Sequence, residues 1–198
     1  MSLSEPAVRK ALYDCQKMHQ LVTGLFGTSR SENDILYRTR TERDNVAIYI
    51  YSSVPVKNER VLPWMNLVAC RNVDGWLNSL QSGGVYGFDI LATPTKKVPR
   101  ENGRSQRRVL RTEEDRLDWL KRKAEQNGFE IVSYVLQNAV PAVYGSHEEG
   151  SGGDFAMGVY QMQGYLRITN EDLFRNVVQK GIGAGKAYGV GMLMLKSA

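Results

Sequence analysis

Residues 155–195 read FAMGVYQMQGYLRITNEDLFRNVVQKGIGAGKAYGVGMLML. Residues 155–168 are rich in apolar and aromatic side chains and predict a strand. Asn170 is followed by two acidic residues, which is typical of a helix N-cap and first turn, so a short helix is expected over 171–180. A glycine-rich connection then leads to a last predicted strand at 190–195.

Residues 112–137, which precede this stretch, add a helix and a strand to the predicted order of elements. Thr112 precedes three acidic residues and predicts the start of a helix that ends at Gly128, and 129–137 predict a strand. A β-α-β-β-α-β unit, the ferredoxin-like arrangement, needs one further strand before its first helix. Residues 85–94, or part of the basic segment that follows them, can supply that strand.

The first half of the chain shows a similar order with one element missing. It contains helical spacing over 4–27, with a second helical piece starting at Asp14, two predicted strands at 35–39 and 45–52, and a weak helix at 73–81. No strand pattern precedes the first helix, so we expect the first sheet to lack its first strand.

These patterns predict an α+β protein with two tandem ferredoxin-like (βαββαβ, RRM-like) domains rather than a doubly wound parallel sheet. The expected division is an N-terminal domain over 1–95, a basic ribbon or loop over 96–111, and a C-terminal domain with the glycine-rich loop over 112–198.

Composition excludes several classes of protein. The chain has 198 residues, with 42% hydrophobic and 24% charged residues, which is ordinary globular usage. No apolar run approaches the roughly 18 residues of a membrane span, and the N-terminus lacks a signal-peptide pattern. Two cysteines, Cys15 and Cys70, cannot build a disulfide framework, so a cytoplasmic location is expected.

Positive charge is concentrated in one short segment. Residues 96–111 contain seven basic residues against one acidic residue, a net charge of +6, whereas the whole chain carries +5. One interpretation is a phosphate-binding element for nucleic acid, and the other is a solvated basic loop without a partner. The basic residues are Lys96, Lys97, Arg100, Arg104, Arg107, Arg108 and Arg111.

The glycine-rich stretch 181–191 does not match a nucleotide-cofactor motif. Lys180 stands where a P-loop requires its first glycine, and a helix precedes the stretch where a dinucleotide fingerprint has a strand. No small-molecule cofactor is therefore expected. The glycines allow backbone N–H groups to approach a phosphate chain, with Lys186 adding charge and Tyr188 a stacking face. The alternative is a tight helix-to-strand connection.

Histidines are the candidate acid–base groups. His19 lies beside the apolar stripe of the first helix, where it is either a groove residue or an ordinary surface histidine, whereas His147 lies in a polar glycine-rich loop. No His or Cys pair has metal-ligand spacing, so no metal site is expected. If the protein cuts nucleic acid, a single histidine without metal is the available group.

The chain resembles the CasE (Cse-type) CRISPR-associated endoribonucleases, the repeat-processing subunit of type I-E Cascade. The resemblance covers essentially the whole chain and is carried by three segments. These are the helical Met18-His19-Gln20 leading to Leu25-Phe26-Gly27, the strand FDILATPTK at 88–96 that runs into the basic stretch, and GIGAGKAYGVGML at 181–193, the most specific of the three.

This resemblance implies a metal-independent endoribonuclease that cleaves precursor CRISPR RNA at the base of the repeat hairpin. It further implies that the protein stays bound to the mature crRNA together with the other Cascade subunits, with His19 as the catalytic residue. Some members have a tyrosine three residues before the histidine, where this chain has Gln16 and the nearest tyrosine is Tyr13. The rival interpretation is a non-catalytic RNA-binding subunit of a ribonucleoprotein.

Overall fold

A computed structural model of the protein describes residues 1–99, 103, 105–146 and 153–197. Among the residues considered above, Arg100, Arg104 and His147 lie outside the described residues. In chain order the elements are α1 (Pro6–Tyr13), α2 (Cys15–Gly24), β1 (Leu36–Glu42), β2 (Asn45–Tyr51), η1 (Asn58–Arg60), α3 (Asp74–Ser79), β3 (Val85–Ala92), β4 (Thr95–Pro99), β5 (Ser105–Val109), α4 (Glu113–Gln126), β6 (Phe129–Gly145), β7 (Phe155–Ile168), α5 (Glu171–Lys180), η2 (Lys186–Tyr188) and β8 (Leu193–Ser197).

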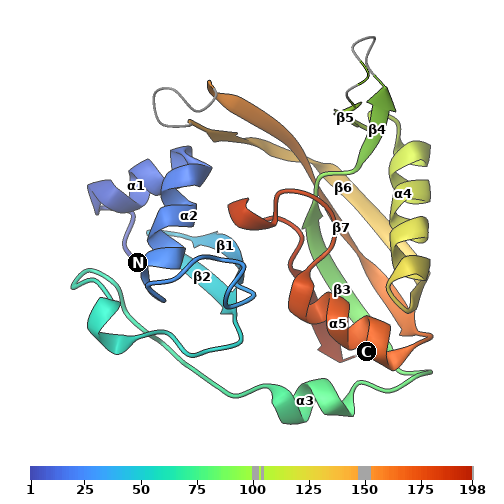
Figure 1. The fold of residues 1–198 in the computed structure, drawn as a ribbon, viewed down its shortest axis with the longest axis horizontal. Coiled ribbons are helices and arrows are strands. Elements are labelled where there is room, and N and C mark those ends of the chain that lie inside the picture. Colours follow the sequence, from blue (N-terminus) through green and yellow to red (C-terminus); the bar gives the residue numbers. More distant parts are fainter. Residues whose placement is uncertain (100–102, 104, 147–152, 198) are drawn as a thin grey trace.

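The C-terminal half is a complete ferredoxin-like unit (Figure 1). Its antiparallel sheet has the strand order β6-β7-β3-β8, and α4 follows β3 while α5 follows β7. Apart from β4 and β5, which lie between β3 and α4, the chain order is β3-α4-β6-β7-α5-β8, the βαββαβ order that the sequence predicts.

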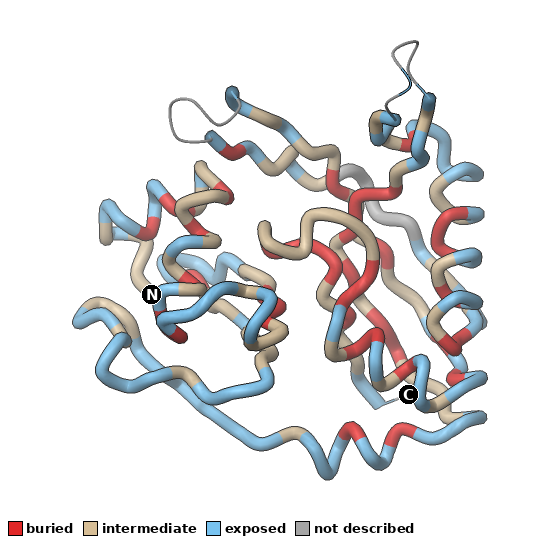
Figure 2. The backbone as a smooth tube through the Cα atoms, viewed as in Figure 1, coloured by how far each residue is buried: buried red, intermediate tan, exposed pale blue. Residues whose placement is uncertain are grey.

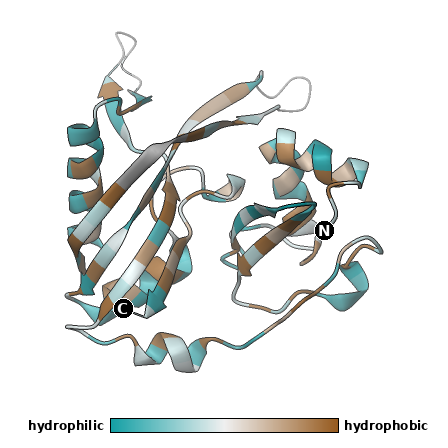
Figure 3. Cartoon of the chain, turned by 180° about the vertical axis from the view of Figure 1, so that it is seen from behind, coloured by the Kyte–Doolittle hydropathy of each residue, from teal (hydrophilic) through white to brown (hydrophobic). Residues whose placement is uncertain are grey.

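Both helices of this unit pack on one face of the sheet. Ile90 and Met162 are partners in the β3–β7 ladder and are fully buried, and they share a hydrophobic core with Trp119 of α4 and Phe174 of α5. Buried positions concentrate where the helices cover the strands (Figure 2). The opposite face, seen from behind in Figure 3, mixes hydrophilic and hydrophobic residues, as the two-residue alternation of a half-covered sheet requires.

The expected boundary at residue 95 places one strand in the wrong half. β3 pairs with β7 over its full length and with β8 on its other side, so residues 85–92 belong to the C-terminal sheet. Alternating apolar residues identify a strand, but they carry no information about which sheet it joins.

The N-terminal half builds a smaller core around α2 and the β1–β2 hairpin. Asp14 begins α2 as expected, because its carboxylate accepts a hydrogen bond from the Gln16 N–H at 2.9 Å. Met18 and Val22 on one side of α2 pack in the same cluster as Tyr37 of β1.

The sheet of this half has two strands in the described residues, β1 and β2. The start of the chain lies at the outer edge of β2. Ser2 forms an isolated antiparallel bridge with Asn45, and the Val46 N–H donates to the Met1 carbonyl at 2.7 Å. No helix in the described part of the chain is long and apolar enough to cross a membrane.

Charged side chains connect the two halves. The Arg38 guanidinium of β1 lies 2.7 Å from the Asp89 carboxylate of β3, and Lys180 lies 2.5 Å from Asp34. Burial alone would raise the pKa of Asp89, but hydrogen bonds from Arg38 and two glutamines outweigh it and hold this pKa below its ordinary value. The carboxylate is therefore ionised at neutral pH and attracts Arg38.

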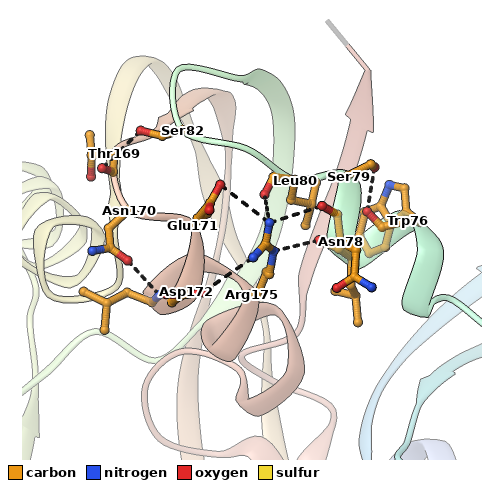
Figure 4. Close-up of polar contacts among 12 residues, drawn as sticks. Trp76, Asn78, Ser79, Leu80, Ser82, Thr169, Asn170, Glu171, Asp172 and Arg175 are labelled. Atoms are coloured by element: carbon orange, nitrogen blue, oxygen red, sulfur yellow. Dashed lines mark hydrogen bonds and ion pairs between the residues drawn. The ribbon is translucent and has the colours of Figure 1, made fainter.

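Arg175 of α5 holds the segment that connects the halves (Figure 4). Its guanidinium donates hydrogen bonds to three carbonyls at the end of α3, those of Leu77 at 3.0 Å, Asn78 at 3.1 Å and Leu80 at 2.9 Å. Since the last carbonyls of a helix lack partners within the helix, one arginine here satisfies groups that would otherwise need water.

We expect Arg175→Ala to lower the free energy of unfolding by about 1–3 kcal/mol, because the hydrogen bonds that it removes involve a charged donor. Urea denaturation measures the change. Arg167→Ala is the matched control, since it removes an exposed ion pair with Glu130 and should cost only about 0–1 kcal/mol. Equal losses for the two variants would contradict the assignment of Arg175 as an anchor.

Candidate functional site

The connection between α5 and β8 reaches from the C-terminal half to α2 (Figure 1). Side chains from both halves hold this loop, residues 181–192. The Thr93 hydroxyl donates to the Ala184 carbonyl at 3.0 Å, and the Tyr37 hydroxyl donates to the Ala187 carbonyl at 3.0 Å. The loop is thus fixed to β1 of one half and to the chain just after β3 of the other.

Glycines shape the short turn η2 within this loop. Gly185 and Gly189 flank η2 with φ angles of 81° and 75°, a left-handed conformation that other residues rarely adopt. A Cβ atom at Gly189 would also lie 3.0 Å from the Tyr37 ring. The glycines therefore allow the tight turn and the close approach of Tyr37.

The turn brings Tyr188 against His19. The two rings are 6.2 Å apart between centroids and are inclined at 73°, an edge-to-face arrangement. His19 is half-buried on α2, and its Nδ1 atom is buried without a hydrogen-bond partner in the described part of the chain. His19 is therefore half-buried against the loop and not an ordinary surface histidine.

The surroundings of His19 favour the neutral imidazole. Burial lowers its pKa below the ordinary value of 6.5, and the Arg30 charge lowers it further, while the Ala187 carbonyl acts in the opposite direction. A neutral imidazole at pH 7 can accept a proton, as a general base must.

Two strands of the basic segment pair with each other as a ribbon. β4 and β5 pair antiparallel, with Lys96 opposite Arg108 and Lys97 opposite Arg107, and all four residues are exposed. Because successive residues of a strand point to opposite faces, the two pairs lie on different sides of the hairpin.

One side of the hairpin lines a basic pocket, a cavity of about 400 Å³ whose other walls come from α4 and the glycine-rich loop. Five of its lining residues are basic and none is acidic. The basic pocket is lined by Thr95, Lys97, Arg107, Trp119, Arg122, Lys123, Asn127, Gly181, Ile182, Gly183, Ala184 and Lys186.

Lys186 shows how strongly positive this region is. Burial lowers the pKa of its ammonium, and the charges of Arg30, Lys180 and Lys123 lower it further. An anion in the pocket would remove much of this repulsion. Arg30 also has a buried Nε atom without a partner among the described residues.

The structure brings Lys97, Arg107 and Lys186 of the predicted RNA-binding residues into one pocket. Lys96, Arg108 and Arg111 are exposed but do not line it, and Arg100 and Arg104 lie outside the described residues.

Sequence reasoning missed three basic residues of this site. Arg122 and Lys123 belong to a run of three basic residues at 121–123, a signal that the net charge of the C-terminal half conceals because acidic residues surround it. Arg30 lies in an irregular loop before β1, where no sequence pattern marks it.

The described residues contain no group of three or more His, Cys, Asp or Glu residues placed to hold a metal ion. Tyr13, the tyrosine nearest to His19 in the sequence, is 82% exposed at the end of α1. Tyr188 makes a ring contact with His19, and the Arg30 charge acts on it.

Comparison with known proteins finds a CRISPR-associated relative. CRISPR-associated endoribonuclease Cse3 of Thermus thermophilus is 24% identical over 123 residues, which are 58% of this chain. The match spans 57% of that relative's length.

Solved structures share the fold over nearly the whole chain. Cse3 bound to a 19 nt RNA has a TM-score of 0.79 at 17% identity and covers 98% of this chain and 95% of its own. Cas6e from Escherichia coli K-12 has a TM-score of 0.72 at 23% identity, with 95% of each chain covered. A chain of a CRISPR RNA-guided surveillance complex has a TM-score of 0.75 at 25% identity and covers 100% of this chain and 96% of its own. The expected tandem ferredoxin-like fold is thereby confirmed.

A family model described as "CRISPR associated protein" matches residues 1–197. The motif resemblance, the fold and this match agree, and the chain belongs to the CRISPR-associated protein family, among the relatives of CasE.

Proposed function

We propose that this protein is a metal-independent endoribonuclease that cleaves precursor CRISPR RNA at the base of the repeat hairpin and stays bound to the mature crRNA within Cascade. The observation that carries the proposal is the loop between α5 and β8, which places Lys186 in the basic pocket and Tyr188 beside His19. Family membership and the names of the relatives, an endoribonuclease and a CRISPR RNA-guided surveillance complex, support the same conclusion.

The reaction uses the nucleophile that RNA itself provides. The neutral His19 imidazole takes the proton of the 2′-hydroxyl, whose oxygen attacks the adjacent phosphorus. The bond from phosphorus to the 5′ oxygen breaks, and that oxygen takes a proton to become a hydroxyl. The other fragment ends in a 2′,3′-cyclic phosphate, or in a 3′-phosphate after addition of water. Holding sugar and phosphate in line supplies much of the rate by orientation.

The cations around the loop have two tasks in this proposal. Arg30, whose charge acts on both His19 and Lys186, and Lys186 itself stabilise the negative charge that develops on the phosphate oxygens. The basic pocket binds backbone phosphates of the hairpin, since the deep, narrow major groove of A-form RNA is poorly accessible to side chains.

We expect His19→Ala to lower the cleavage rate on the order of 10²- to 10⁴-fold, the range for one general acid or base, with little change in RNA affinity. A 2′-deoxy sugar upstream of the cut should block cleavage and leave binding intact, because it removes the nucleophile. EDTA should leave the rate unchanged. Single-turnover assays with labelled repeat RNA measure all three effects.

His147→Ala is the control, since it removes the other histidine of the chain. Full activity of His19→Ala, cleavage of the 2′-deoxy RNA, or inactivation by EDTA would each contradict the mechanism. RNA binding by the wild-type protein without any cleavage would instead support the non-catalytic RNA-binding subunit.

The role of His19 as base predicts the pH dependence of cleavage. Because its pKa in the folded protein is lowered, the neutral form is lost only as the pH falls below 6.5. The second-order rate constant at subsaturating protein should therefore rise with pH, with a midpoint below 6.5, and then level off near neutrality. A rate constant that falls as the pH rises through this range would assign His19 as the acid.

We expect Arg107→Ala and Arg122→Ala, combined, to weaken hairpin binding and to flatten its salt dependence. The log–log slope should decrease by about 0.7–0.9 for each phosphate that the variant no longer neutralises. Lys121→Ala is the matched control, because it removes the same charge from α4 at a position that does not line the basic pocket. Equal effects of Lys121→Ala and Arg122→Ala, or an unchanged slope in the double variant, would refute the pocket as the binding site.

A further inference from the structure

The hydroxyl of Tyr188 is free although the residue is half-buried. It forms no hydrogen bond within the described part of the chain, whereas the hydroxyl of Tyr37, which is 2% exposed, donates to Ala187. Tyrosines that serve only for packing usually place a buried hydroxyl on a protein partner, as Tyr37 does. The Tyr188 hydroxyl is not among the buried atoms that lack a partner, so a group from outside the chain can reach it, and its ring lies beside His19.

The ring of Tyr188 is held in place on two sides. Phe155, at the start of β7, lies 5.1 Å from it between centroids at an angle of 45°, and His19 lies edge-to-face at 6.2 Å. The Tyr188 N–H donates to the Gly185 carbonyl at 2.8 Å and closes the turn. A ring fixed in this way limits the orientations of the neighbouring imidazole.

The hydroxyl is a donor under physiological conditions. Burial raises the Tyr188 pKa above its ordinary value of 10.0, and the nearby Cys15 acts in the same direction. It therefore stays protonated at neutral pH, and a phosphate ester, whose oxygens are acceptors, suits it as a partner. Lys186 lies two residues earlier in the same turn and lines the basic pocket. An RNA backbone whose phosphates occupy the pocket therefore passes close to the turn that carries Tyr188.

We propose that Tyr188 is the second side chain of the cleavage site. Its ring positions the His19 imidazole, and its hydroxyl donates a hydrogen bond to a non-bridging oxygen of the scissile phosphate. This inference rests on the proposed ribonuclease function. The hydrogen bond strengthens as negative charge builds up on that oxygen during attack by the 2′-hydroxyl, so it favours the transition state over bound RNA.

Two substitutions separate the hydroxyl from the ring. Tyr188→Phe keeps the ring and should lower the single-turnover rate on the order of 10²-fold, as expected for loss of one donor to a developing oxyanion, with unchanged RNA affinity. The pH at which the cleavage rate constant reaches half of its plateau value should not change. Tyr188→Leu should lower the rate at least as much and should also move the midpoint upward toward 6.5, because an imidazole without its aromatic neighbour is better hydrated.

Tyr165→Phe is the matched control, since Tyr165 is 42% exposed on β7 and does not line the basic pocket. Thermal unfolding of each variant confirms that it is folded. A wild-type rate for Tyr188→Phe, or an unchanged pH midpoint for Tyr188→Leu, would overturn the inference while cleavage by the wild-type protein through His19 still stood. Cleavage by His19→Ala at the wild-type rate would instead refute the proposed function.

Discussion

The hydrogen bond from the Tyr37 hydroxyl to the Ala187 carbonyl is the contact on which the candidate site depends. It joins β1 of the N-terminal half to the glycine-rich loop of the C-terminal half at 3.0 Å. Tyr37 shares a core with Met18 of α2, so the position of the loop is set relative to the helix that carries His19. Without the bond, the hydroxyl of Tyr37, a residue that is 2% exposed, would lose its partner, and this cost favours the observed arrangement.

Around this contact the protein maintains an arrangement that is unfavourable in the absence of a ligand. Basic side chains gather in one pocket without an acidic neighbour in its lining, and the pKa of Lys186 is lowered by burial and by that repulsion. Buried nitrogen atoms of His19 and Arg30 lack partners within the described residues. A phosphate chain supplies both the negative charge and the acceptors that complement these groups.

Much of the fold could be predicted because its signals are local. Asp14 and Asn170 mark helix starts, and in the structure each carboxylate or amide oxygen accepts from a backbone N–H of the first turn. The boundary at residue 95 was wrong, because the alternation in β3 is the same whichever sheet it joins. Arg30 was missed for a related reason, since a loop residue gains its role only from the segments that fold against it.

The amino-acid sequence alone indicated the order of most helices and strands, the fold class, a basic ribbon or loop over 96–111 and His19 as the candidate acid–base residue. Helix caps, glycines and hydrophobic periodicity are local signals that involve only a few neighbouring residues. They can therefore be recognised in the amino-acid sequence without knowledge of the tertiary structure. Only the tertiary structure decided that β3 joins the C-terminal sheet and that Tyr188 meets His19. These contacts join residues far apart in the chain, and they exist only because two packed cores and the Tyr37–Ala187 bond bring α2 and the loop together.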